Sequence, residues 1–257
     1  MDMNNGILKV VKSLAAKKYR DEEGLFVAEG TKCVRDTWQH FNCRWLIAKR
    51  SWYEQCGTAE HYDKIVFANG QQMARISQFD TPSDVIAVYE KPVDTIDSDS
   101  VARNLNIVLD NIQDPGNLGT IIRLADWFGI GHIFCSMATA DAFSPKVVQS
   151  TMGSIARVTL HYTDLSEMFR QLDGKVPVYG TFLDGSNIYE QPGLANGIIV
   201  MGNEGNGISP EVEAFVSKRL LIPSYPMGRP TAESLNVAVA TAITCAEFRR
   251  RQSLSEE

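Results

Sequence analysis

The chain has 257 residues, of which 44% are hydrophobic, and a net charge of −6; this is enough apolar sequence for two ordinary domains or one large one. The acidic balance argues against indiscriminate binding to polyanions, and no apolar run approaches the roughly 18 residues that a membrane span needs. Five scattered cysteines without a CxxC pair indicate neither a disulfide framework nor a zinc knuckle.

From Asn5 to Glu90 the hydrophobic pattern alternates between helix and strand in short pieces. Helices are predicted over Ile7–Tyr19, Thr31–Phe41, Ser51–Tyr62 and Gln71–Ile76, and strands over Leu25–Ala28, Arg44–Ala48, Lys64–Ala68 and Val85–Tyr89. We therefore predict a small α/β domain over residues 1–92, followed by a polar, acidic linker over residues 93–104.

Residues 105–257 restart the alternation with longer apolar strands. Strands are predicted over Ile107–Leu109, His132–Cys135, Val176–Thr181, Ile198–Met201 and Leu220–Pro223, and a last helix over Glu233–Arg251. Nearly continuous apolar strands with helices between them indicate a mainly parallel sheet covered on both faces. Ligands bind at the carboxyl ends of such strands, and three of those ends carry unusual loops.

The first loop lies in DNIQDPGNLGTIIRLADW, residues 110–127. Asn117 lies at the start of the predicted helix and Arg123 follows six residues later, so both can face one cleft at the end of the strand. A helix cap would equally explain Asn117, and a surface ion pair would equally explain Arg123.

The second loop lies in IIVMGNEGNGISPEV, residues 198–212, where three glycines in six residues let a backbone approach a ligand closely. Their order is G-x-x-G-x-G, whereas dinucleotide folds use G-x-G-x-x-G. Ser209 is a predicted cap of a helix with acidic residues in its first turn, and these would repel a pyrophosphate. The pattern therefore disfavours a nicotinamide or flavin dinucleotide site.

The third loop lies in LLIPSYPMGRPTAESLNVAVATAITCAEFRRR, residues 220–251. A helix is expected to open at Ser234-Leu235-Asn236 and to continue with a surface of small residues. Such a surface permits close approach of another chain segment or of a flat ligand, although ordinary contact between helices explains it equally well.

Positive charge is concentrated in residues 1–50, which hold ten Lys and Arg against six Asp and Glu, while the rest of the chain carries −10. Lys17, Lys18 and Arg20 form one basic cluster, and Arg249–Arg251 form another at the end of the last helix. Basic residues in a last helical turn also complement the helix dipole, so each cluster has a structural explanation beside a binding one. The N-terminal MDMNNGILKVVK lacks the order of a signal peptide, and we expect an unprocessed, soluble, cytoplasmic protein.

Three motifs in chain order resemble those of the SpoU (TrmH-like) family of SPOUT methyltransferases: N-x5-R in the first loop, GNEGxGIS in the second, and IP followed by ESLNVAVA in the third. KKYRDEEGLFVAEG and TPSDVIAVYE resemble the ribosomal-protein-like RNA-binding extension of many members. The resemblance implies a SPOUT-type C-terminal trefoil knot, a homodimer, and methyl transfer from S-adenosylmethionine to a ribose 2′-hydroxyl. The extension favours ribosomal RNA slightly over tRNA. The stretch between Ile222 and Ser234 is longer and richer in proline than in shorter members.

The resemblance also implies roles for individual residues. The catalytic candidates are Arg123, Asn117, Glu204, Ser234 and Asn236. The cofactor-binding candidates are Gly202, Gly205, Ile222, Leu235 and Asn236, with Thr181 added at the end of the preceding strand. The RNA-binding candidates are Lys17, Lys18, Arg20 and Arg123. The four histidines show no metal-ligand spacing, so no metal is expected.

Two other functions stay open at this point. A catalytically silent RNA-binding protein with the same fold is the main alternative, although the five catalytic candidates speak against it. A nucleotide-dependent oxidoreductase is disfavoured by the order of the glycines.

Overall fold

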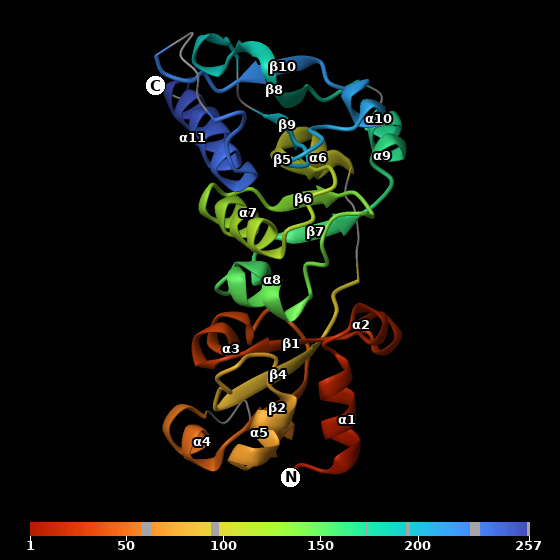
Figure 1. Cartoon of the computed structure of the whole chain (residues 1–257), viewed down its shortest axis with the longest axis vertical. Coiled ribbons are helices and arrows are strands. Elements are labelled where there is room, and N and C mark those ends of the chain that lie inside the picture. The colour runs from red at the N-terminus through yellow and green to blue at the C-terminus, as the bar shows by residue number, and fades with distance from the viewer. Residues whose placement is uncertain (58–62, 94–97, 173, 194–195, 227–231, 256–257) are drawn as a thin grey trace. The chain divides into compact units, whose positions relative to one another are not determined.

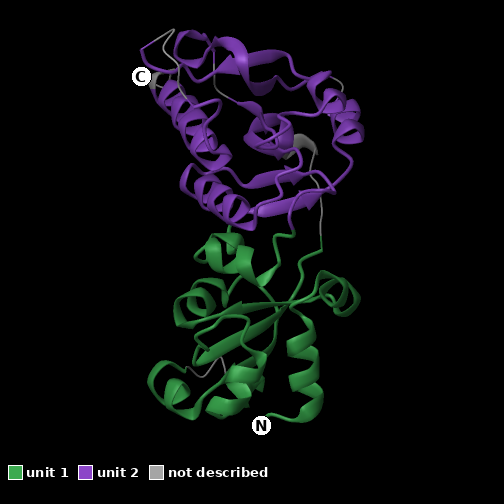
Figure 2. Cartoon of the chain, viewed as in Figure 1, with its two compact units in different colours: residues 1–93, 141–157 green, residues 94–140, 158–257 purple. Residues whose placement is uncertain are grey.

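The computed structural model describes residues 1–57, 63–93, 98–172, 174–193, 196–226 and 232–255. The chain forms two compact units (Figure 2): unit 1 comprises residues 1–93 and 141–157, and unit 2 comprises residues 94–140 and 158–257. The predicted division at residues 93–104 did not include the return of residues 141–157 to the N-terminal unit.

Unit 1 contains a four-stranded sheet in the order β1-β4-β2-β3, in which only β2 and β3 are parallel. The strands are β1 (Leu25–Glu29), β2 (Cys43–Ala48), β3 (Ile65–Phe67) and β4 (Val85–Glu90). The helices are α1 (Asn5–Ser13), α2 (Lys17–Glu23), α3 (Thr31–Thr37), α4 (Arg50–Cys56), α5 (Gly70–Ile76) and α8 (Pro145–Ser150), with the 3-10 turn η2 (Ser154–Ala156) (Figure 1). Buried side chains from α1, α5 and the strands form one hydrophobic core.

Residues 141–157 join unit 1 through a buried ion pair and an aromatic contact. The Arg20 guanidinium donates to Asp141 Oδ2 at 2.9 Å from Nε and 2.6 Å from Nη2. The ring of Phe26 in β1 lies 4.8 Å from that of Phe143. A segment inserted between two strands of unit 2 therefore completes the core of unit 1.

Unit 2 contains a six-stranded sheet in the order β10-β8-β9-β5-β6-β7, and every neighbouring pair is parallel. The strands are β5 (Leu105–Leu109), β6 (His132–Cys135), β7 (Thr159–Tyr162), β8 (Val178–Asn187), β9 (Gly197–Met201) and β10 (Lys218–Leu221). The helices are α6 (Ser98–Arg103), α7 (Pro115–Trp127), α9 (Leu165–Leu172), α10 (Pro210–Glu213) and α11 (Val237–Ser255), with the 3-10 turn η3 (Ile188–Glu190). The predicted parallel sheet is confirmed.

Helices cover both faces of this sheet, as predicted (Figure 1). Alternate strand residues such as Val108 and Val200 join one core with α6, α9 and α10. On the other face α7 and α11 contact each other, and Phe248 of α11 lies edge-on against Tyr179 of β8 at 4.9 Å. Burial on both sides explains why β9 is apolar throughout and why Asn106 is the one polar residue of β5. The trefoil knot stays a prediction.

Several predicted boundaries were wrong for local reasons. The single helix expected over Ile7–Tyr19 is two helices, because the backbone is extended at Ala16. Arg20 Nη1 donates to the free carbonyls of Leu14 and Ala15 at 2.7 and 2.8 Å, which satisfies the end of α1. The predicted helix Ser51–Tyr62 forms only α4, which ends at Cys56 before an extended Gly57, and residues 58–62 lie outside the described residues.

The predicted linker also contains a helix, α6, anchored by the buried side chain of Val101. Asn106 Nδ2 donates to the carbonyls of Val101 and Asn104, so the polar composition concealed an ordered turn. Residues 94–97 of that segment lie outside the described part of the chain. Strand β7 was missed because its four residues, TLHY, contain no apolar run and only His161 among them is buried.

The five cysteines are free. Burial raises the pKa of the Cys33 thiol to about 11 and that of Cys245 to about 12, which keeps both thiols protonated at neutral pH.

Candidate active site

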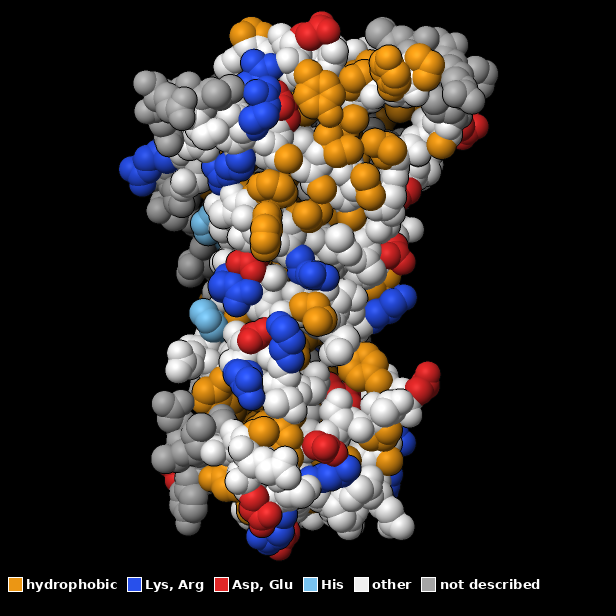
Figure 3. All heavy atoms as spheres, turned by 90° about the vertical axis from the view of Figure 1, so that its left-hand side faces the viewer, with side chains coloured by type: hydrophobic (Ala, Val, Ile, Leu, Met, Phe, Trp, Pro, Cys, Tyr) orange, Lys and Arg blue, Asp and Glu red, His pale blue; other side chains and the backbone are white. Residues whose placement is uncertain are grey.

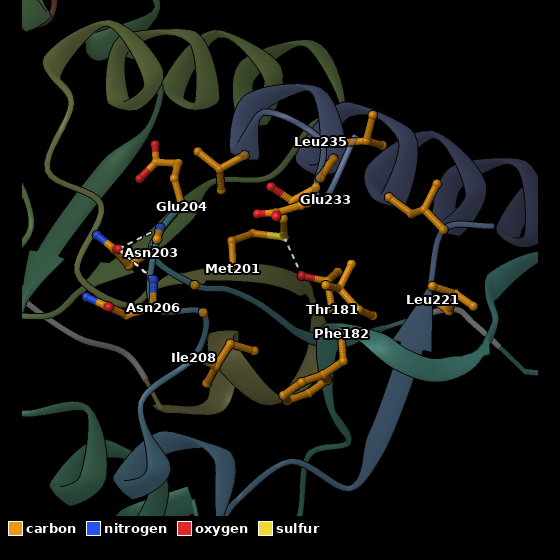
Figure 4. A pocket seen from close by; sticks show the side chains of 18 residues that line it. Thr181, Phe182, Met201, Asn203, Glu204, Asn206, Ile208, Leu221, Glu233 and Leu235 are labelled. Atoms are coloured by element: carbon orange, nitrogen blue, oxygen red, sulfur yellow. Dashed lines mark hydrogen bonds between the residues drawn. The ribbon is translucent and has the colours of Figure 1, made fainter. Parts of the chain in front are cut away.

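A cavity of about 470 Å³ lies in unit 2 at the carboxyl ends of β9 and β10, beside the middle of β8. Its walls come from four parts of the chain: Thr181–Leu183, Met201–Ile208, Leu221–Ile222, and, at the start of α11, Glu233–Leu235 with Val237 and Ala240. Figure 4 shows side chains from these stretches pointing toward one shared space. The parallel sheet therefore places a cavity where its topology predicts one.

The glycine loop after β9 holds its own shape through backbone pairing. Asn203 and Gly207 exchange two backbone hydrogen bonds of 2.9 and 2.8 Å, and Asn203 Oδ1 accepts from the backbone N–H groups of Gly205 and Asn206 (Figure 4). A Cβ on Gly202 would lie 2.3 Å from the carbonyl carbon of Gly207. Glycine is therefore required at 202 by the fold of the loop itself.

The end of β5 fixes this loop in place. Asn203 Nδ2 donates to the Asn111 carbonyl at 2.8 Å, and Asp110 Oδ2 accepts from the Ser209 N–H at 2.7 Å. Ser209 precedes α10 as predicted, but its side chain makes no capping hydrogen bond. Neither Asp110 nor Asn203 was among the predicted site residues, although Asp110 precedes the first motif and Asn203 lies within the second.

One hydrogen-bonded chain joins the three predicted loops. Asn117 Nδ2 donates to Glu204 Oε1 at 2.5 Å, and Asn117 Oδ1 accepts from Asn236 Nδ2 at 2.9 Å. Asn236 Oδ1 in turn accepts from the N–H groups of Ala238 and Val239, which starts α11. Asp114 caps α7, so the capping explanation for Asn117 was wrong. The amide of Asn117 links the first loop to the other two.

The remaining motif residues divide into two groups. Thr181, Gly202, Gly205, Ile222, Leu235, Glu204 and Ser234 line the cavity. Asn236 is outside that lining but holds Asn117, and Arg123 is exposed on α7, away from the cavity wall. Arg123 makes no ion pair or hydrogen bond within the described part of the chain, so the surface ion pair proposed as an alternative does not form there.

The cavity has an acidic wall. Glu204 and Glu233 line it, and none of its described lining residues is Lys, Arg or His. This distribution suits a ligand with positive charge and hydroxyl groups, and it is unsuited to a pyrophosphate.

One apolar wall of the cavity, Phe182, was not predicted. The Arg219 guanidinium lies 3.5 Å from the centroid of the Phe182 ring and pairs with Asp184 and Glu213. The hydrogen bond to Asp184 raises the pKa of Arg219, and the same bond lowers the pKa of the Asp184 carboxyl. This arrangement holds the aromatic ring against the cavity.

The basic clusters are mostly engaged within the protein. Arg20 is 3% exposed and binds Asp141, so its predicted contact with RNA is corrected: the guanidinium is a buried structural group. Lys17 and Lys18 are exposed on α2. Arg249 donates to the carbonyls of Phe128 and Gly129 at the end of α7, while Arg250 and Arg251 bind Glu247.

The described residues contain neither a membrane-spanning helix nor a cluster of metal ligands. No helix there has both the length and the apolar character to cross a bilayer. No group of three or more His, Cys, Asp or Glu side chains within the same ranges could hold a metal ion.

Two known protein families together match nearly the whole chain. The model of the SpoU rRNA Methylase family matches residues 104–246, and that of the MRM3-like substrate binding domain matches residues 5–87. The Bacillus subtilis 23S rRNA (guanosine(2553)-2′-O)-methyltransferase RlmP is 30% identical over 241 residues, which cover 93% of this chain and 94% of RlmP.

Solved structures agree with these matches. A TrmH-family protein from Porphyromonas gingivalis is 40% identical with a TM-score of 0.88, over 98% of this chain and 100% of that one. An rRNA methyltransferase from Sinorhizobium meliloti, crystallised with AdoMet bound, is 30% identical with a TM-score of 0.84, over 97% of this chain and 96% of that one.

Proposed function

The chain belongs to the SpoU rRNA methylase family, and we propose that it transfers the methyl group of S-adenosylmethionine to a ribose 2′-hydroxyl of ribosomal RNA. The observation that carries this proposal is the chain of hydrogen bonds from Glu204 through Asn117 to Asn236, which joins three loops beside one cavity. Ribosomal RNA is favoured because RlmP, similar over nearly its whole length, is named for a 23S rRNA substrate.

The cavity fits the cofactor in size and charge. Its volume of about 470 Å³ lies within the range of roughly 300–1,000 Å³ that small-molecule sites occupy. Thr181, Ile222 and Leu235 supply its walls, and the loop from Gly202 to Gly207 supplies backbone groups. S-adenosylmethionine brings a methyl group on a positively charged sulfonium, and the carboxylates of Glu204 and Glu233 are the complementary charges on the cavity side.

The amide chain orders the site for an in-line displacement. Asn117 donates a hydrogen bond to Glu204 and accepts one from Asn236, so the first loop cannot turn away without breaking both bonds. Holding two reactants in line can supply about 7–11 kcal/mol of the barrier reduction. Asn117 is therefore assigned to orient the ribose side, and Ser234 to shape the rim.

Arg123 is assigned to the RNA. A guanidinium, with a pKa above about 12, is a poor proton acceptor but a strong phosphate ligand. Exposed and without an internal partner in the described ranges, Arg123 is available to bind a phosphate and to stabilise the alkoxide that develops on the ribose. The proton then leaves to solvent or to a phosphate oxygen.

We also propose a homodimer that works in the cytoplasm. Figure 3 shows apolar side chains gathered on the face of unit 2 that carries α7 and α11. Trp127 on α7 is 84% exposed, and Val239 on α11 is 48% exposed. Large apolar side chains exposed on two neighbouring helices mark an interaction surface, and an equivalent copy is the partner that the family implies.

The test is methyl transfer to isolated RNA. The purified protein is incubated with methyl-labelled S-adenosylmethionine and ribosomal RNA from cells that lack it, with tRNA from the same cells as control. We expect label in ribosomal RNA, recovered as a 2′-O-methylnucleoside. RNA binding without transfer would support the catalytically silent alternative, and label in tRNA alone would reject the assignment of ribosomal RNA.

A further inference from the structure

A second hollow, in unit 1, lies where α1 contacts α5 and where the chain turns from α1 into α2 (Figure 1). Its volume is about 710 Å³, and its lining includes Asn5, Lys9 and Lys12 of α1, Tyr19 of α2 and Arg75 of α5. We call it the α1–α5 groove. None of the candidate site residues lines it, and Tyr19 is its one lining residue from the stretch KKYRDEEGLFVAEG.

The polar face of α1 lines this groove because of helical spacing. Asn5, Lys9 and Lys12 are separated by four and three residues, so they share one side of the helix. Ile7 and Val11 of the same helix are buried in the core of unit 1. The core contacts of α1 therefore fix the direction in which its lysines point.

The groove is positively charged, and no acidic side chain among the described residues pairs with its cations. Lys9, Lys12 and Arg75 are all exposed, and within the described part of the chain none has an ion-pair partner. No Asp or Glu is among the described residues that line the groove.

Several other cations of unit 1 are paired, in contrast to the three around the groove. Lys32 binds Asp36 at 2.7 Å, Lys49 binds Asp84 at 2.6 Å, and Arg50 lies 3.7 Å from Asp2. In a chain with a net charge of −6, three unpaired cations around one hollow form a local site for an anion.

Tyr19 adds an aromatic surface to this charge. Its side chain is 42% exposed, and Lys18 Nζ lies 5.9 Å from the ring centroid. A cationic groove that follows phosphates and an aromatic ring on which a base can stack are the two parts of sites for single-stranded nucleic acid.

We propose that the α1–α5 groove binds an unpaired segment of the RNA substrate, with Lys9, Lys12 and Arg75 on its phosphates and Tyr19 stacked on a base. The inference rests on the proposed function, which makes RNA the substrate. It assigns the RNA contact of unit 1 to α1, α5 and Tyr19, in place of the buried Arg20.

The test compares two triple variants with the same change of charge. The groove variant is Lys9→Gln, Lys12→Gln and Arg75→Gln, and the control is Lys32→Gln, Lys49→Gln and Arg50→Gln. Binding of a fluorescently labelled single-stranded RNA 20-mer and of 23S rRNA is measured between low and moderate salt. Thermal unfolding of each variant checks that it is folded.

We expect the groove variant to bind both RNAs at least tenfold more weakly, and its slope of log affinity against log salt to fall by about 2, since each single-strand phosphate contact contributes roughly 0.7. The control should keep most of the affinity and slope. Tyr19→Leu should weaken binding by about 5- to 100-fold, whereas Tyr19→Phe should not, because stacking needs only the ring. In methyl transfer, the groove variant should raise KM for RNA and leave kcat unchanged at saturating RNA.

Equal losses of affinity in the groove and control variants would overturn the inference, as would unchanged binding by a folded groove variant. Failure of the proposed function has a different signature: the unsubstituted protein would then transfer no methyl group, while its RNA binding would still depend on Lys9, Lys12 and Arg75.

Discussion

Arg123 and Asn117 lie on the same helix, yet the structure gives them different tasks. Asn117 is bound on both sides by Glu204 and Asn236, whereas Arg123 is exposed without an internal partner in the described ranges. A side chain held by two neighbours is suited to orient a reactant. An unpaired cation close to it is suited to bind the anionic substrate, and the two roles can be separated by substitution.

We expect Arg123→Ala to lower kcat for methyl transfer by about 10²–10³, the loss typical for removing one donor that stabilises a developing oxyanion. Cofactor affinity, measured by calorimetry, should be unchanged because Arg123 is not in the cavity lining. Arg123→Lys should recover part of the rate if positive charge alone contributes. Near-normal transfer by the alanine variant would remove Arg123 from the mechanism.

Whether the role of a single residue could be predicted from the sequence depended on how far along the chain its interaction partner lies. The motif positions around the cavity were predictable because glycines, prolines and asparagines in the local sequence mark each loop. The role of Arg20 was not, because Asp141 lies 121 residues away and no local pattern links the two. The α1–α5 groove was missed for the same reason, since Arg75 joins Lys9 and Lys12 only after folding.

At the scale of helices and strands, the hydrophobic pattern predicted the buried strands of unit 2. It did not predict a strand whose residues differ in burial. β5 and β9 are buried at every position and are apolar except at Asn106. β7 at the edge of the sheet has no such run. Helix α11 begins later than predicted because the Asn236 side chain accepts the first N–H groups and thereby ends the preceding loop.

The C-terminal part of α11 is stabilised by charge as well as by apolar contact. Glu247 is 4% exposed, and its single carboxylate accepts hydrogen bonds from both Arg250 and Arg251. The hydrogen bond from Arg250 is the main cause that lowers the pKa of Glu247 from its ordinary value of 4.5. A carboxylate with a lowered pKa in the folded state stabilises it above the unfolded pKa and ceases to do so as the pH falls through the folded value.

We therefore expect Glu247→Gln to lower the Tm at pH 7 and to reduce the loss of Tm as the pH falls below the ordinary carboxyl pKa of 4.5 and through the lower pKa of the folded state. Thermal unfolding across this range measures both effects. Glu167→Gln, which changes an exposed carboxylate paired with Arg170 in α9, is the control and should leave the curve nearly unchanged. A Tm difference at Glu247 that is the same at every pH would contradict the electrostatic explanation.

At the scale of the whole molecule, the chain crosses between its two units more than once, because residues 141–157 belong to unit 1. The buried pair of Arg20 and Asp141 holds this crossing in place.

Asp141→Asn should destabilise unit 1 by about 3–5 kcal/mol, the cost of leaving a buried charge without its partner. The double variant with Arg20→Met should cost much less than the sum of the two single changes, because both act on one interaction. Urea unfolding of the four proteins measures the cycle, and simple additivity would show that the pair does not join the two segments.

Association of two copies can be tested on the apolar face of α7 and α11 without touching the cavity. Neither Trp127 nor Val239 lines it, so a charge placed there should act on assembly first. We expect Trp127→Glu with Val239→Glu to convert a dimer into a monomer in sedimentation velocity, because a carboxylate buried in an apolar contact has no partner. Met137→Glu, at an apolar residue of unit 2 that is 65% exposed and lies outside both helices, is the matched control and should stay dimeric. If the double variant sediments as the wild type does, α7 and α11 are not the interface; if it becomes monomeric and also loses methyl transfer, each active site needs the second copy.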